Sequence, residues 1–374
     1  MKVSILLVLN IFSVLLLPAQ NFPSDHHATE QTVQLYRNLK LISDKGILFG
    51  HQDDLAYGVN WKYQPGKSDV KDVTGDYPAV YGWEIGHLEI DAAVNLDSVP
   101  FDRMKEYISS AYSKGGVITI SWHGTNPMTG KTAWDPENGT VESILPGGDK
   151  QEVFKAQLDK VADFMLGLKD NKEALIPVIF RPFHEHTGGW FWWGNKTTGN
   201  DLYKKLFRFT VQYLRDTKNV HNLLYAYNTG SEFNDATTYL QRYPGDDVVD
   251  IVSFDTYQNG NPAIDSSWQV KTSQLLSVIE RIAAEKNKIA ALAEVGFNKI
   301  PYDQWWTNTL YKAIGSHKLA YVLLWRNAGY KAKEKETEFY VPYKGHSSEL
   351  DFKKFYHLPK TLFQSDINYK LIYK

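Results

Sequence analysis

The chain has 374 residues, and its 41 Lys and Arg against 43 Asp and Glu give a formal net charge of only −2. Because proteins that bind nucleic acid use many Lys and Arg contacts with phosphates, this balance argues against nucleic acid as the main partner. Cysteine is absent, which excludes disulfides, thiolate zinc sites, iron–sulfur clusters and cysteine nucleophiles. Hydrophobic residues make up 43% of the chain and aromatic residues 14%, so we expect a large core and a further use for the aromatic rings.

Residues 1–20 have the pattern of a secretory signal peptide. Lys2 precedes an apolar run from Val3 to Leu17, and Ala19 provides a small residue near a cleavage point. The run is shorter than the roughly 20 residues that a membrane-spanning helix needs, so we expect cleavage and no membrane association of the mature protein. Export without disulfides predicts a bacterial periplasmic or secreted protein, and we expect it to be a monomer.

Eight short, almost continuously apolar runs alternate with longer amphipathic segments along the rest of the chain. Such runs are typical of strands that are buried on both faces. The predicted strands are residues 46–49, 79–83, 117–122, 175–180, 223–227, 251–254, 289–293 and 320–325. The predicted helices between them include residues 101–113, 151–168, 202–214, 270–285 and 302–314. This order predicts a single α/β domain over residues 21–374, a (β/α)8 barrel with long βα loops, with a doubly wound parallel sheet as the alternative.

Polar side chains gather where the predicted strands end. Active sites of (β/α)8 barrels lie at the C-terminal ends of the strands, so these residues are the candidates for chemistry. They are His51, Gln52, Asp53, Glu84, His123, Arg181, His184, Glu185, His186, Asp255, Tyr257, Glu294, Arg326 and Asn327.

Two of these carboxyl groups, Glu185 and Glu294, follow the fourth and seventh predicted strands. The ends of those strands face each other across the mouth of a barrel, so residues far apart in sequence can become neighbours there. Retaining glycoside hydrolases need two carboxyls about 5–5.5 Å apart, one to protonate the leaving group and one to attack the anomeric carbon. The alternative is a structural role, in which either Glu caps a helix or pairs with Arg181.

A loop rich in tryptophan directly follows Glu185. It contains Trp190, Trp192 and Trp193 between glycines. Exposed indole rings offer flat apolar faces to sugar C–H groups, whereas buried ones hold a loop in place. We expect one or two of the three to contact a sugar and the others to pack in the interior. Trp325 has the same two possible roles.

Seven segments, in this order from about residue 49 to residue 363, together resemble glycoside hydrolase family 26. No single segment is specific, but the combination is. The seven segments are Phe49-Gly50-His51-Gln52-Asp53, Ser121-Trp122-His123, Arg181-Pro182-Phe183-His184-Glu185, Ser253-Phe254-Asp255-Thr256-Tyr257, Ala293-Glu294-Val295-Gly296, Leu324-Trp325-Arg326-Asn327 and Pro342-Tyr343-Lys344-Gly345-His346.

The resemblance implies a β-mannanase that cleaves β-1,4-mannosidic bonds of mannan, galactomannan or glucomannan with retention, in a (β/α)8 barrel without cofactor or metal. It implies that Glu185 is the acid/base and Glu294 the nucleophile. It further implies that His184 helps to position the nucleophile and the sugar, and that Tyr257 hydrogen-bonds the nucleophile. The implied substrate contacts are His123, His184, Trp190, Tyr257, Trp325 and Arg326, with Asp255 supporting them from behind; Glu84 has no implied role.

Other functions stay open at this point. Relatives that cleave β-1,3-xylan or mixed-linkage β-glucan share the catalytic motifs. His184, Glu185 and His186, with His51 and His123, could instead bind the metal of a polysaccharide deacetylase, because residues i and i+2 of a strand face the same way. A non-catalytic sugar-binding protein is the third alternative. Internal or terminal cleavage and tolerance of galactose branches depend on loops, and residues 85–100 and 134–150 are the candidates.

Overall fold

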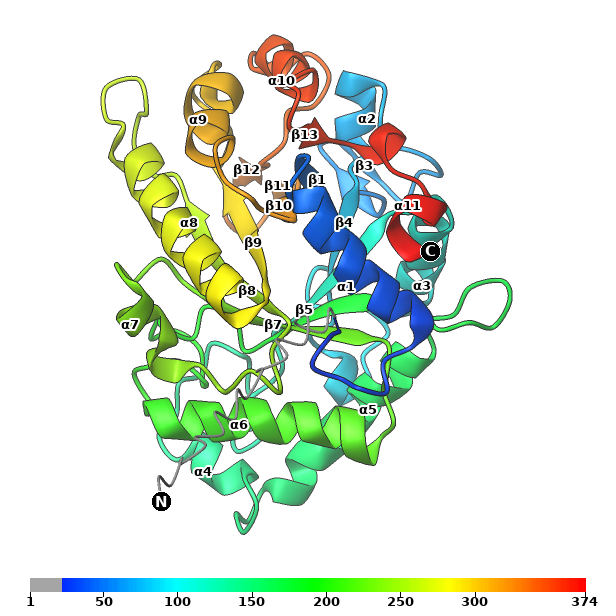
Figure 1. Cartoon of the computed structure of the whole chain (residues 1–374), viewed down its shortest axis with the longest axis vertical. Coiled ribbons are helices and arrows are strands. Elements are labelled where there is room, and N and C mark those ends of the chain that lie inside the picture. Colours follow the sequence, from blue (N-terminus) through cyan, green and yellow to red (C-terminus); the bar gives the residue numbers. More distant parts are fainter. Residues whose placement is uncertain (1–21) are drawn as a thin grey trace, which may run out of the picture.

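The computed structural model describes residues 22–374, so the predicted signal peptide lies outside the described residues. A nine-stranded parallel sheet dominates the fold, and pairing of β1 with β10 closes eight of its strands into a barrel (Figure 1). This closure confirms the predicted (β/α)8 barrel and excludes the doubly wound sheet. The barrel strands are β1 (Ile47–Gln52), β4 (Val80–Glu84), β5 (Val117–Trp122), β6 (Val178–Pro182), β7 (Leu223–Thr229), β8 (Ile251–Tyr257), β9 (Ile289–Gly296) and β10 (Tyr321–Leu324).

The barrel strands are almost entirely buried, which explains why they read as continuous apolar runs. The prediction was wrong at the start of the fourth strand, which begins at Val178 rather than at Leu175. Leu175 instead pairs antiparallel with Lys169 ahead of the barrel. An apolar run alone does not distinguish these two kinds of pairing.

Helices cover the outside of the barrel (Figure 1). Those predicted between strands are present as α3 (Phe101–Ser113), α5 (Gln151–Leu166), α6 (Asn200–Gln212) and α8 (Ser267–Lys286). The helix expected over residues 302–314 is shorter, with a π-helical turn over Trp306–Leu310 followed by α9 (Tyr311–Ile314). No described helix is long and apolar enough to cross a membrane.

A helix that the sequence analysis did not predict, α1 (Glu30–Ser43), covers the N-terminal end of the barrel. The Thr29 side chain caps it by accepting from the Thr32 backbone N–H. The hydroxyl of Tyr36 donates to the carbonyl of Asn287, two residues before β9, at 2.5 Å. The other elements outside the prediction are β2 (Tyr57–Gly58), β3 (Trp61–Lys62), α2 (Asp69–Thr74), α4 (Thr140–Ile144), α7 (Ala236–Tyr239), β11 (Gly329–Lys331), β12 (Glu336–Glu338), α10 (Glu349–Tyr356), β13 (Thr361–Leu362) and α11 (Tyr369–Tyr373).

Much of the aromatic content fills the layer between strands and helices. Phe49 of β1 stacks on Phe363 with ring centroids 4.6 Å apart, and Trp306, Phe352 and Phe355 surround the pair. The aromatic side chains therefore serve the core here, at the outer face of the strand that closes the barrel.

Gly50 lies where β1 pairs with β10 and closes the barrel, and we expect a substitution there to destabilise the fold. A β-carbon on Gly50 would lie 2.7 Å from Leu323 Cδ1 and 2.9 Å from Val80 Cβ, on the strands either side of β1. We expect Gly50→Ala to lower the free energy of unfolding by about 1–3 kcal/mol, because the strands must move apart. In Gly199→Ala the added carbon meets no atom within 4 Å. Urea unfolding of both variants tests this, and an equal loss in the two would contradict it.

Candidate active site

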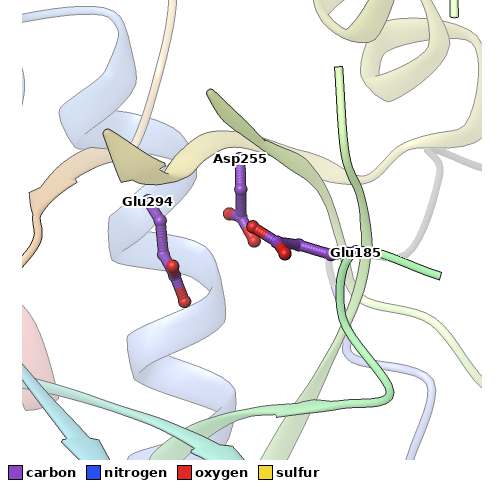
Figure 2. A group of neighbouring side chains, drawn as sticks. All are labelled: Glu185, Asp255 and Glu294. Atoms are coloured by element: carbon purple, nitrogen blue, oxygen red, sulfur yellow. The ribbon is translucent and has the colours of Figure 1, made fainter. Parts of the chain in front are cut away.

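Three carboxyl groups from different strands converge at the mouth of the barrel (Figure 2). Glu185 follows β6, Asp255 belongs to β8 and Glu294 to β9. One oxygen of each carboxyl lies within 4.8 Å of one oxygen of each of the others. The sequence analysis therefore placed Glu185 and Glu294 correctly at one site, and their spacing is of the order that a retaining glycosidase uses.

The turn after β6 has an unusual backbone that directs Glu185 into the mouth. Phe183 and Glu185 have φ angles of 53° and 50°, in the left-handed region that residues other than glycine rarely adopt. The Glu185 N–H donates to the carbonyl of Asn228 at 3.0 Å, and the Tyr203 hydroxyl donates to the carbonyl of Phe183 at 3.1 Å. Neighbouring elements thus hold the strained turn, as is common at functional sites.

Two donors hold the side chain of Glu294. Nη2 of Arg181 donates to Oε1 of Glu294 at 2.6 Å, and the Tyr257 hydroxyl donates to Oε2 at 2.7 Å. Burial disfavours the charge on Arg181, but Glu294 and Asp255 outweigh it and raise its pKa. The ion pair with Arg181 was the structural alternative considered for the two glutamates. It is present for Glu294, and it suits a nucleophile because it fixes the orientation of the carboxylate.

Glu185 has a raised pKa. Burial and the charge of Glu294 raise its pKa from 4.5 to about 7. The indole N–H of Trp190 donates to Oε2 of Glu185 at 3.1 Å. A neutral carboxyl beside an ionised one is the arrangement that separates a general acid from a nucleophile.

Asp255 lies beside these two groups (Figure 2) and is supported by a residue that the sequence analysis missed. The side-chain amide of Asn228 donates to Oδ2 of Asp255 at 2.7 Å, while Nη1 of Arg181 lies 3.6 Å away. Burial and the charge of Glu294 raise the pKa of Asp255 well above its ordinary value. The predicted fifth strand ended one residue before Asn228, and the polar residue directly after that run was the available signal.

The histidines do not gather as a metal site would require. His51 bonds to Asp54 at 2.7 Å, whereas the ring of His186 packs on Tyr203 with centroids 4.0 Å apart. Because β6 ends at Pro182, His184 and His186 are not i and i+2 of a strand, as the metal-site alternative required, and their rings contact different residues. Among residues 22–374 only Glu185, Asp255 and Glu294 have the spacing of metal ligands, and the Arg181 guanidinium already contacts two of those three carboxylates.

His184 instead bonds to His123. Their Nε2 atoms are 3.1 Å apart, and Nδ1 of His123 lies 2.7 Å from Oε2 of Glu84. Trp134, which the sequence analysis did not single out, stacks on the His123 ring with centroids 5.0 Å apart. Contact of His123 and His184 with substrate stays a prediction, but both side chains have a defined place at the site.

The tryptophan loop divides into exposed and buried rings. Trp190 is 41% exposed, whereas Trp192 and Trp193 are buried, and the Trp193 indole donates to the carbonyl of His184 at 2.8 Å. Trp134 is also exposed, at 47%, and Trp325 is half-buried directly after β10. These two exposed indoles and Trp325 provide the faces on which a sugar can stack.

Arg326 ties two peripheral segments together. Its guanidinium forms an ion pair with Asp97 in the loop over residues 85–100, and its Nε lies 3.4 Å from Oε1 of Glu338 in β12. Because these carboxylates already engage the guanidinium, any contact with substrate would be shared with them. The predicted substrate contact of Arg326 stays a prediction.

A cavity of about 590 Å³ opens beside Glu185. Trp190 and Tyr257 line it together with Glu232, Trp268 and Lys271, which the sequence analysis did not identify. Glu232 lies in the loop after β7, and Trp268 and Lys271 lie near the start of α8. None of the three is at the end of a predicted strand, so no pattern in the sequence pointed to them. The cavity leaves room for a polar ligand next to Glu185.

Comparison with known proteins gives the family. The family model described as glycosyl hydrolase family 26 matches residues 24–338. The chain belongs to this family. Its fold superimposes with a TM-score of 0.87 on a family 26 β-mannanase from Bacteroides ovatus, which is 44% identical over 92% of this chain and 98% of that one. The catalytic domain of an endo-β-1,4-mannanase from Bacillus sp. JAMB-750 gives a TM-score of 0.86 and 36% identity, over 94% of this chain and 96% of that one.

A curated relative from Bifidobacterium adolescentis, named mannan endo-1,4-beta-mannosidase, is 36% identical over 361 residues. The match covers 92% of this chain but only 36% of that relative's length. These findings confirm the resemblance to family 26.

The proximity of Glu294 to Glu185 predicts a measurable coupling. Glu294→Gln removes the neighbouring negative charge, so the pKa of Glu185 should fall from about 7, while burial still holds it above 4.5. Glu232→Gln is the matched control, because Glu232 contributes less to the raised pKa and should lower it by less. Carbon-13 NMR titration of labelled glutamate carboxyls tests this. A pKa of Glu185 that does not change in Glu294→Gln would contradict the assignment.

Proposed function

We propose that the protein is a retaining β-mannanase that hydrolyses β-1,4-mannosidic bonds in mannan, galactomannan or glucomannan. The observation that carries this proposal is that Glu185, whose pKa is raised to about 7, lies within 4.8 Å of Glu294, which accepts hydrogen bonds from Arg181 and Tyr257. The names of the similar proteins support mannan as the substrate.

In the first step Glu294 attacks the anomeric carbon while Glu185 gives its proton to the departing glycosidic oxygen. Arg181 and Tyr257 each donate to one oxygen of Glu294, so the attacking carboxylate is oriented before substrate arrives. The product of this step is a glycosyl ester on Glu294, and the shortened polymer leaves with the proton from Glu185.

In the second step water hydrolyses the ester. Esterification removes the negative charge of Glu294, which is one of the two main causes of the raised pKa of Glu185. The pKa of Glu185 therefore falls after the first step, and the resulting carboxylate can take a proton from the attacking water. One side chain thus acts as acid and then as base.

The surroundings of the carboxyls suit an uncharged polysaccharide. The exposed rings of Trp134 and Trp190 offer stacking surfaces near His123 and Glu185. The net charge of −2 provides no strong attraction for a charged polymer, so affinity would come from stacking and hydrogen bonds. The predicted export stays a proposal that rests on residues 1–20, and a mature protein that retains Met1 would contradict it.

Substitution of the two carboxyls separates their roles. Glu294→Gln should abolish turnover of mannan and of an aryl β-mannoside alike, because no nucleophile remains. Glu185→Gln should lower kcat on mannan by roughly 10²- to 10⁴-fold but reduce the first step much less for a dinitrophenyl mannoside, whose leaving group needs no proton. Stopped-flow release of dinitrophenol measures the first step. Substantial turnover by Glu294→Gln would show that the nucleophile is wrongly assigned.

A product time course tests the substrate and the mode of cleavage. The relatives' names favour internal cleavage, so mannohexaose should give several product lengths from the outset. Mannobiose alone from the first time point would instead indicate cleavage at a chain end. Parallel incubations with galactomannan, β-1,3-xylan and mixed-linkage β-glucan cover the alternatives. Hydrolysis of either non-mannan polymer without hydrolysis of mannan would refute the substrate.

A further inference from the structure

We propose that Glu84 is a positioning residue that holds His123 as an imidazolium, which donates from Nε2 to His184 and provides a positive charge beside Glu185. The inference rests on the proposed function and deepens it, because it assigns a role to a buried carboxylate that takes no part in the two steps above.

Glu84 is a fully buried carboxylate at the end of β4. It accepts four hydrogen bonds, from the Gly86 N–H at 2.5 Å, the Ser121 hydroxyl at 2.7 Å, the His123 N–H at 2.8 Å and Nδ1 of His123 at 2.7 Å. A carboxyl that accepts from four donors is ionised. Burial alone would raise the pKa of Glu84, but the charge and hydrogen bonds of His123 outweigh it and hold the pKa below its ordinary value.

The charge of Glu84 needs a partner, and His123 provides it. Within residues 22–374, His123 is the only basic side chain in ion-pair contact with Glu84. A buried anion without a cationic partner is strongly unfavourable, which favours a protonated His123. Burial opposes this charge, but Glu84 raises the pKa of His123 above its ordinary value.

A cationic His123 leaves only one arrangement of protons in the contact between the two histidines. Nδ1 of His123 donates to Glu84, so a cationic His123 also carries a proton on Nε2, which lies 3.1 Å from Nε2 of His184. His184 is the acceptor, because burial and the nearby charges of His123 and Arg181 lower its pKa and keep it neutral. His184 is thereby fixed in the tautomer with its proton on Nδ1.

The remaining neighbours of His123 are consistent with a cation. The charged and titratable groups that face it are Glu84, His184, Glu185 and Glu294. The ring of Trp134 stacks on it with centroids 5.0 Å apart and an interplanar angle of 13°. An indole face beside a cationic ring adds cation–π attraction. The imidazolium thus lies between a carboxylate, an aromatic ring and the two proposed catalytic carboxyls.

This arrangement has a consequence for Glu185. Burial and Glu294 raise the pKa of Glu185, while the charges of His123 and Arg181 limit the rise and Glu232 adds to it. Glu84→Gln removes the charge that keeps His123 protonated. A neutral His123 no longer limits the rise, so the pH above which the acid loses its proton should increase by roughly 0.5–1 unit. The kcat at the optimum should fall, since His184 loses its fixed donor.

Nitrogen-15 NMR of histidine-labelled protein without substrate tests the protonation directly. The wild-type spectrum at pH 7 should show both ring nitrogens of His123 protonated, with the signals assigned by their loss in His123→Gln. In Glu84→Gln the same ring should be a neutral tautomer. A neutral His123 in the wild type would overturn the proposal, and that spectrum decides the question even if Glu84→Gln does not fold.

Glu89 provides the matched control. It is also a buried carboxylate, and it accepts from the indole of Trp122 at 3.1 Å and the Thr125 N–H at 2.7 Å, without contact to a histidine. In pH profiles of kcat/KM on mannohexaose, Glu84→Gln should move the basic limb upward, whereas Glu89→Gln should leave it in place. If the basic limb of the profile lies at the same pH in both variants, Glu84 has only a structural role. If wild-type protein fails to hydrolyse mannohexaose, the proposed function is wrong, while the NMR result still stands.

Discussion

The whole site depends on one buried guanidinium. Arg181 of β6 lies between Glu294 and Asp255, at 2.6 and 3.6 Å, so that one buried cation contacts both buried carboxyl groups. The charge of Glu294 in turn raises the pKa of Glu185. Two chemically identical side chains thus have different surroundings, a guanidinium contact for Glu294 and burial beside a negative charge for Glu185, and these surroundings suit different roles.

The barrel provides the positions that this interaction needs. Glu185, Asp255 and Glu294 come from three strands that are far apart in sequence, and their oxygens meet only because β6, β8 and β9 end at the same rim. The left-handed residues Phe183 and Glu185 turn the chain immediately after β6. This turn separates the side chains of His184 and His186, so that the first joins the site and the second packs on Tyr203.

Periodicity and strand ends were sufficient to predict the barrel and the meeting of Glu185 with Glu294, because parallel strands buried on both faces read as apolar runs. The same patterns could not predict that Glu84 contacts His123. This contact depends on the register of β4 and β5, which places Glu84 beside Ser121, two residues before His123. The contribution of Asn228 was missed because the predicted strand ended at residue 227, two residues before the end of β7. Trp134 lies in a loop, where sequence patterns give no position in space. The roles in substrate contact of His123, Trp190, Trp325 and Arg326 stay predictions.

The account makes one central claim, that Glu294 attacks the sugar directly while Glu185 protonates the leaving group. A covalent intermediate that forms and is then hydrolysed inverts the anomeric carbon twice, so the first product keeps the β configuration. Proton NMR of the anomeric signals during the first minutes of mannohexaose hydrolysis measures this directly. The account predicts that the β-anomer appears first and then mutarotates toward equilibrium. Initial release of the α-anomer would show a single displacement by water and would contradict the account.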